Sequence, residues 1–152
     1  MGAESSATPL LPGPEVVHIC IIDADRQFSD QLGRLLADEM PGMVNIVGTY
    51  DEIPQPLAVP YAVSLVIFDP ELDDFHELPK ALSRMWKAFG NDALLAVHAD
   101  SWKNDKSMLK HELQLFGVQI GFTRFNLNKC FKLVAKVAMR EPLAAWVSEF
   151  NI

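Results

Sequence analysis

The feature that most constrains this chain is the repeated pairing of a short apolar run with a segment of helical periodicity. Five such runs follow one another, at residues 17–23, 44–50, 62–68, 93–99 and 118–122. The first, third and fourth are nearly continuous in Val, Ile, Leu and Ala, without polar alternation. Strands of that kind are covered on both faces, as in a parallel sheet. The alternation therefore predicts an α/β fold, a doubly wound five-stranded parallel sheet with helices on both faces in three layers.

The helical segments are predicted from apolar residues spaced three and four apart. The aligned sets are Phe28, Leu32, Leu35 and Leu36; Leu78, Leu82, Met85 and Phe89; Met108, Leu109, Leu113 and Phe116; and Leu127, Phe131, Val134, Ala135 and Ala138. Gly117 is a natural helix stop. Pro54, Pro56 and Pro60 make a regular helix after the second run unfavourable.

Length and charge limit the class of protein. A chain of 152 residues fits one domain with a full core. The net charge of −7 argues against nonspecific binding to DNA or to an anionic membrane. No apolar run is long enough to cross a bilayer, and the first residues lack the pattern of a secretory signal. Cys20 and Cys130 stand alone in apolar surroundings, as buried reduced thiols do. We expect a cytoplasmic protein.

Three parts of the chain are expected to differ in organisation. Residues 1–14 are rich in Ser, Pro and Gly and predict a disordered tail. Residues 15–140 hold the alternating runs and form the predicted domain. Residues 141–152 form a C-terminal extension that extends the last helix, packs back on the domain or meets a partner.

Polar residues follow the runs at their carboxyl ends, where functional groups gather in an open parallel sheet. Asp23 and Asp25 end the first run, Asp69 follows the third, and His98 and Asp100 end the fourth. If the first, third and fourth strands are neighbours, Asp23, Asp69 and His98 meet at one edge.

Two interpretations of these acids are open. Several carboxylates together make an oxygen-rich pocket that suits Mg²⁺, and a carboxylate beside Mg²⁺ can attack a phosphoryl group. Alternatively, Asp23 or Asp25 caps the following helix, and Asp69 opens a turn before Pro70.

The order of motifs resembles the receiver domain of bacterial response regulators over roughly residues 16–140. The carriers are "CIIDADRQFSDQLGRLLAD", "SLVIFDPELDD", "ALLAVHAD" and "LFGVQIGFTRFN". The resemblance implies a flavodoxin-like fold. It also implies that Asp69 stands at the phospho-acceptor position and that Asp23, Asp69 and the backbone carbonyl of Glu71 stand at the Mg²⁺ site.

Several positions depart from the family pattern. Ala24 replaces a carboxylate that binds Mg²⁺ directly, so Mg²⁺ is expected to bind weakly or not at all, or to need Asp25. His98 replaces the switch serine or threonine, Arg124 the lysine, and Phe125 the proline after it. Histidine is larger than a hydroxyl and titratable, and arginine is a planar fork rather than a compact ammonium.

Three functions follow from this pattern. The first is a pseudo-receiver that acts by phosphorylation-independent protein contact or dimerisation in a two-component or transcriptional pathway, with the Asp69 pocket filled by contacts to Arg124 or His98. The alternative is a working receiver, phosphorylated on Asp69 by a histidine kinase with Mg²⁺-dependent switching. The third is an enzyme or small-molecule binder on the same architecture.

The resemblance also implies where a partner binds. The expected surface is the face of the fourth helix, fifth strand and fifth helix, which carries Lys110, Phe125 and Lys129. A homodimer through this face is expected, without direct contact to nucleic acid or membrane. Because no nucleotide-binding or nucleophile motif is visible, we expect neither enzymatic activity nor a cofactor.

Overall fold

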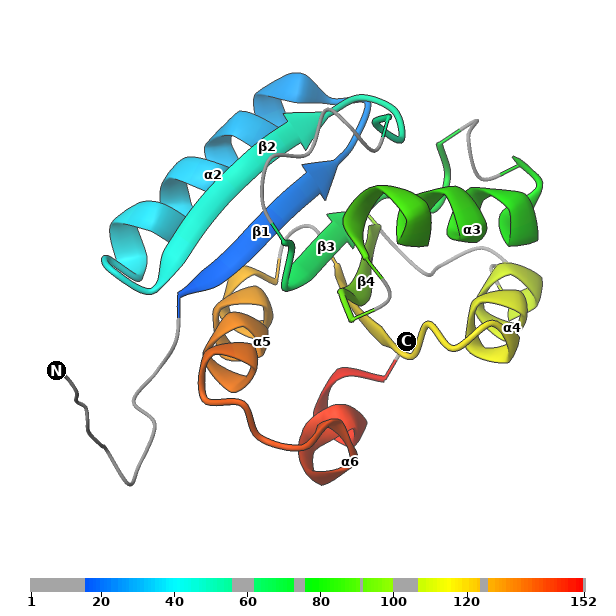
Figure 1. The fold of residues 1–152 in the computed structure, drawn as a ribbon. Helices are drawn as coiled ribbons and strands as arrows, with labels where there is room; N and C mark the ends of the chain where they lie inside the picture. The colour runs from blue at the N-terminus through cyan, green and yellow to red at the C-terminus, as the bar shows by residue number, and fades with distance from the viewer. Residues whose placement is uncertain are drawn as a thin grey trace, which may run out of the picture.

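The protein folds around one five-stranded parallel sheet with the strand order β2-β1-β3-β4-β5 (Figure 1). The computed structural model describes residues 16–55, 62–72, 76–90, 92–99, 107–123 and 126–151. Within these residues the elements are β1 (Val17–Ile22), α2 (Arg26–Glu39), β2 (Val44–Tyr50), β3 (Leu65–Phe68), α3 (Leu78–Phe89), β4 (Leu94–Ala99), α4 (Ser107–Leu115), β5 (Ile120–Thr123), α5 (Leu127–Ala138), α6 (Leu143–Trp146) and a 3-10 turn, η3 (Val147–Phe150).

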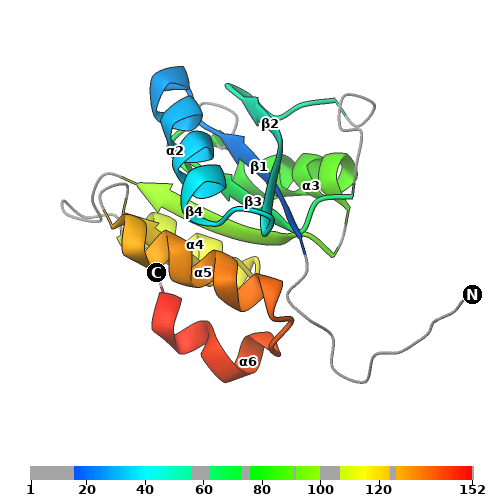
Figure 2. The same cartoon turned by 90° about the vertical axis from the view of Figure 1, so that its left-hand side faces the viewer.

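Helices cover both faces of the sheet, as Figure 2 shows from the side. Alternate side chains of the central strands enter two separate cores. One set, which includes Ile22 and Phe68, packs under α3 and α4. The other set, which includes Ile21 and Ile67, packs under α2 and α5. The predicted doubly wound α/β fold is therefore confirmed, and the period of two along each strand explains why both faces are apolar.

The helices bury only part of the predicted residues. On α4, Leu113 is buried, whereas Met108 and Phe116 are exposed. All four aligned residues of α3 are buried. In α2, Leu35 is exposed, and the helix instead turns Gly33 toward Ile46 of the edge strand β2. In α5, Cys130 and Leu133 are buried, whereas Phe131 and Ala135 lie at the margin of the core. The buried stripe of α5 is thus rotated slightly from the one predicted.

Helix α4 ends as its glycine predicts. Gly117 adopts φ +89, a left-handed conformation that side chains with a Cβ rarely take. This turn lets the backbone N–H of Val118 donate to the carbonyl of Leu113 over 2.8 Å, which satisfies a carbonyl near the helix end. The chain then enters β5 directly.

The C-terminal extension packs back on the domain, the second of the three expected arrangements. Trp146 and Phe150 are buried in the same core as α5, with their rings edge to face at 5.5 Å. The indole N–H of Trp146 donates to the carbonyl of Glu141 over 3.1 Å. Asn151 forms an antiparallel bridge with Ile120 and so covers part of the outer edge of β5. The predicted disordered tail lies outside the described residues.

No helix in the described part of the chain combines the length and apolarity that a bilayer crossing needs.

Candidate functional site

Strand register brings Asp23, Asp69 and His98 to the same edge of the sheet. Ile22 pairs with Phe68, and Phe68 pairs with Val97, so the next residue on each strand is one of the three. Each of the three comes two positions after a residue that faces the core under α2 and α5. Those core residues are Ile21, Ile67 and Ala96. The three side chains therefore leave the sheet on one side. The predicted convergence is confirmed.

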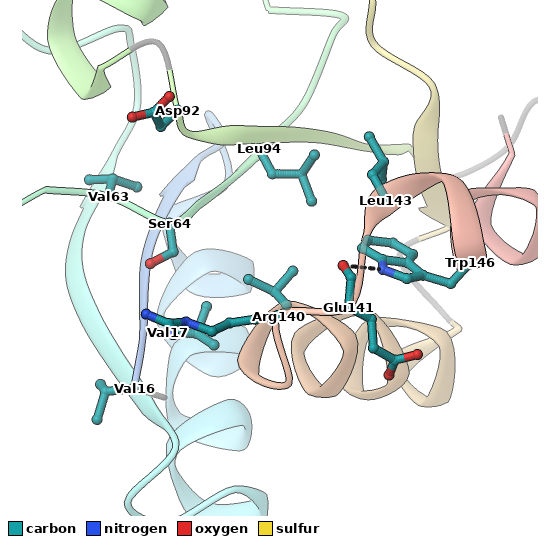
Figure 3. A pocket seen from close by; sticks show the side chains of 11 residues that line it. Val16, Val17, Val63, Ser64, Asp92, Leu94, Arg140, Glu141, Leu143 and Trp146 are labelled. Atoms are coloured by element: carbon teal, nitrogen blue, oxygen red, sulfur yellow. Dashed lines mark hydrogen bonds between the residues drawn. The ribbon is translucent and has the colours of Figure 1, made fainter. Parts of the chain in front are cut away.

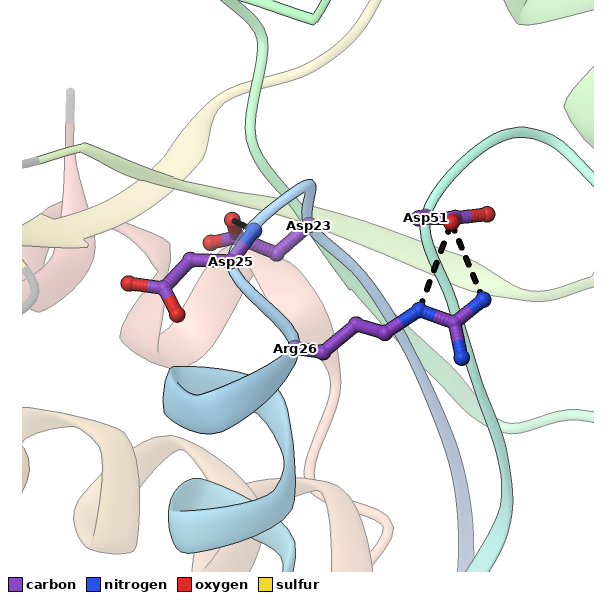
Figure 4. Close-up of polar contacts among 4 residues, drawn as sticks. All are labelled: Asp23, Asp25, Arg26 and Asp51. Atoms are coloured by element: carbon purple, nitrogen blue, oxygen red, sulfur yellow. Dashed lines mark hydrogen bonds and ion pairs between the residues drawn. The ribbon is translucent and has the colours of Figure 1, made fainter.

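Asp23 is buried and engaged at both of its carboxylate oxygens. Its side chain is 1% exposed. Oδ1 accepts a hydrogen bond of 2.7 Å from the backbone N–H of Asp25 (Figure 4). Oδ2 lies 3.0 Å from Nε2 of His98. Contacts within the protein therefore occupy both oxygens of the Asp23 carboxylate.

His98 is fully buried, at 0% exposed. Its ring lies 5.0 Å from the ring of Phe28 and 6.3 Å from that of Phe122. The ring nitrogens form no aligned hydrogen bond with any described residue, so the short contact with Asp23 is a charge pair when the imidazole is protonated. The sequence had pointed to Asp69 as a partner for His98, and the structure places Asp23 there instead. Burying such groups is costly unless they are paired, so the two side chains depend on each other.

Asp25 caps helix α2. Its Oδ1 accepts a hydrogen bond from the backbone N–H of Phe28 over 3.1 Å, which confirms the capping interpretation for this residue. Ala24 lies between it and Asp23 and is exposed. Recruiting Asp25 to a metal would remove the cap, because the same carboxylate would have to turn away from the helix.

A surface pair lies beside this loop. The guanidinium of Arg26 donates to Oδ2 of Asp51 over 3.0 Å, from the start of α2 to the end of β2 (Figure 4). The hydrogen bond from Arg26 lowers the pKa of Asp51. The side chain of Arg26 therefore points toward the end of β2.

Asp69 is partly exposed and forms a turn. Its Oδ1 accepts a hydrogen bond of 2.9 Å from the backbone N–H of Glu71, and its carbonyl accepts one of 3.3 Å from the N–H of Leu72. This is the side-chain turn that Asp commonly makes after a strand. The side chain of Glu71 is exposed.

The described carboxylates at this end of the sheet are engaged in contacts within the protein. Mg²⁺ needs near-octahedral oxygen ligands, including one or two available carboxylates. Here Asp23 is held by His98 and the Asp25 N–H, and Asp25 caps a helix. Among the described residues, no three His, Cys, Asp or Glu side chains gather closely enough to share a metal ion. Weak or absent Mg²⁺ binding stays a prediction.

The other predicted site residues, apart from Arg124, belong to the expected interaction face. Lys110 lies on α4 and Lys129 on α5, both half-buried. Arg124 and Phe125 lie outside the described residues. For the surface predicted for dimerisation, the structure therefore describes α4, β5 and α5 but not Phe125.

A hollow of about 500 Å³ at the opposite end of the sheet was not foreseen (Figure 3). It lies between the amino ends of the strands and the extension, where Leu94, Leu143 and Trp146 form an apolar wall. Arg140, with φ +58, also lines it. In the sequence, the spacing of Trp146 and Phe150 four residues apart could have indicated that the extension packs back on the domain.

Comparison with known proteins identifies a known structure with a similar fold. No family model matches the chain. No curated protein matches it either. Among solved structures, it is similar to one described as the signal receiver domain of a response regulator, NarL, from Mycobacterium tuberculosis, with a TM-score of 0.63 and 15% sequence identity. The match covers 84% of this chain and 100% of that one. The fold is that of a receiver domain. At 15% identity the comparison establishes the fold alone, and the function has to be inferred from the residues of the site.

Proposed function

We propose that the protein is a receiver-like signalling module that acts through protein contacts independently of phosphorylation. The observation that carries the proposal is the contact of His98 with Asp23, two buried side chains 3.0 Å apart. In the family that the sequence resembles, a small switch hydroxyl and an available metal carboxylate stand at these two positions.

The chemistry of phosphoryl transfer supports this proposal. A phosphoryl group accepted by Asp69 would need nearby positive charge to stabilise the oxygens that bear charge in the transition state. The metal that supplies this charge is disfavoured, because Ala24 has no carboxylate and both oxygens of Asp23 are engaged. Freeing Asp23 would leave His98 buried without its partner, so binding a metal would carry a structural cost.

A protein with this fold and without the phosphorylation switch acts through its surface. The proposed partner is another protein or a second copy of this chain, in a two-component or transcriptional pathway. The face of α4, β5 and α5, with Lys110 and Lys129, is the candidate surface. Because Asn151 already bridges Ile120, contacts there would come chiefly from the two helices.

The working receiver remains the second candidate, because Asp69 is partly exposed at the carboxyl end of β3. Incubation with Mg²⁺ and acetyl phosphate, followed by intact mass measurement, separates the two. We expect no added phosphoryl mass on the wild-type protein. The Ala24→Asp/His98→Thr variant restores the missing carboxylate and hydroxyl and serves as the comparison. Stoichiometric labelling of the wild type that disappears in Asp69→Asn would establish the working receiver and end the proposal.

A further inference from the structure

A surface groove between α3 and the end of α4 is lined mainly by apolar side chains. It encloses about 660 Å³. Pro79, Leu82 and Trp86 form the wall on α3, and Phe116, just after α4, lies opposite them. Phe116 is 41% exposed. Exposed aromatic and aliphatic side chains in a hollow are typical of a surface that another molecule covers.

Other apolar side chains are exposed on the same two helices or near them. Trp86 also lines a smaller hollow of about 170 Å³ that continues to Leu143 of α6. On α4, Met108 is 76% exposed and Leu115 is 67% exposed. These two residues are seven apart and therefore lie on the same side of the helix. Apolar side chains are thus exposed both in the groove and on α4.

The charge beside the groove indicates what kind of segment fits. Helix α3 carries Lys80, Arg84 and Lys87 and no acidic residue, although the whole chain has a net charge of −7. All three are exposed. Spaced four and three apart, they form one strip along the helix. We call Lys80, Arg84 and Lys87 the basic strip.

The basic strip borders the groove. Lys87 itself lines the hollow, together with Ser83. At about 100° per helical residue, Lys80 and Arg84 follow Lys87 on the solvent side of α3, away from the sheet. Lys80 forms a surface ion pair of 2.9 Å with Glu77, and pairs that exposed are readily exchanged for others. The groove therefore has an apolar floor and one positively charged rim.

We infer that this groove binds an acidic amphipathic segment of a partner protein. Apolar side chains on one face of the segment would fill the space between Trp86 and Phe116. Acidic side chains on the adjoining face would meet the basic strip, and this complementarity would set orientation and association rate. The inference names a partner chemistry for the proposed interaction function and so rests on it, but its binding residues lie mainly on α3 rather than on β5 and α5.

The probe for this inference is a fluorescein-labelled helical peptide of about 16 residues, roughly four turns. Leu and Phe occupy one face and Glu the adjoining positions, and a second peptide carries Lys in place of every Glu. Fluorescence anisotropy gives the affinity for the wild-type protein. We expect saturable binding of the acidic peptide that is at least about tenfold tighter than that of the basic peptide and that weakens with added salt.

Protein variants locate the binding site. Lys80→Glu/Lys87→Glu should weaken the acidic peptide by about tenfold, and Phe116→Ser should weaken it similarly. The matched control is Arg26→Glu/Arg34→Glu, which makes the same charge change on α2, where Arg26 also forms a surface ion pair. The control should leave the affinity within about twofold. Circular dichroism of each variant verifies that it is folded.

Several results would overturn the inference. These are absence of saturable binding up to about 1 mM protein, equal affinity for the two peptides, or an equal loss in the α2 control. Loss of self-association in Lys80→Glu/Lys87→Glu, measured by sedimentation without peptide, would identify a second copy as the occupant. None of these measurements involves phosphorylation. Labelling of Asp69 would therefore refute the proposed function and leave the groove to be judged by the peptides alone.

Discussion

The contact between Asp23 and His98 predicts a strong energetic coupling between the two residues. Their side chains are 1% and 0% exposed, so water cannot compensate either one after its partner is removed. His98→Leu would leave the carboxylate of Asp23 buried without its contact to the imidazole, at a cost of about 3–5 kcal/mol. In an Asp23→Asn background the same change leaves only a neutral amide, which retains the acceptor for the Asp25 N–H. The cost there is about 1–3 kcal/mol.

The difference between these two costs is a coupling free energy of about 2 kcal/mol. Urea unfolding of the wild type, both single variants and the double variant measures it, with tryptophan fluorescence as the signal. For an m-value of about 2 kcal/mol/M, His98→Leu should lower the midpoint by about 2 M. Single-variant costs that add in the double variant to within about 0.5 kcal/mol would refute the mutual dependence of the pair. The explanation that His98 keeps Asp23 from binding a metal would then fail as well.

Three further predictions follow from other contacts. Phe150→Ala should destabilise the protein by about 3–5 kcal/mol, because this ring is buried beside Trp146; a loss below about 1 kcal/mol in urea would show that the extension is not part of the core. Asp25→Ala should cost about 1 kcal/mol through loss of the α2 cap, and Asp25→Ser should recover most of it in thermal unfolding. Burial raises the pKa of Cys20 and of Cys130 to about 12, from an ordinary value of 9.0. The folded state thus holds both thiols neutral, so stability should be unaffected by them below about pH 9 and should fall as the pH rises from there toward 12. Burial also raises the pKa of Tyr50, so replacing both cysteines by Ala should reduce the alkaline loss rather than remove it, and an unchanged slope would contradict the assignment.

The sheet and the position of the site follow from short-range patterns. Continuous runs of Val and Ile predict strands buried on both faces, and β1 and β3 are such strands. Once β1, β3 and β4 are neighbours, the residues after each strand must meet. The period of two then places Asp23, Asp69 and His98 on the same side. Neither step depends on the details of side-chain packing.

The contacts within the site do depend on packing. Two carboxylates, Asp23 and Asp69, end adjacent strands, and no local pattern decides which of them His98 approaches. The choice follows from the enclosure of His98 between Phe28 and Phe122, whose positions are set by α2 and β5. Such long-range contacts have no signature in the spacing of residues along the chain.

The last residues of the described chain bear on how this sheet meets other sheets. A parallel sheet has two outer strands, and their unpaired backbone groups can accept a strand from another molecule. Here Asn151 lies antiparallel to Ile120 and blocks part of the β5 side, which leaves β2 as the more open side among the described strands. Strand addition through β2 alone ends with two molecules, whereas addition on both sides can continue into a fibre. Nine residues, 143–151, thereby limit end-to-end growth of the sheet.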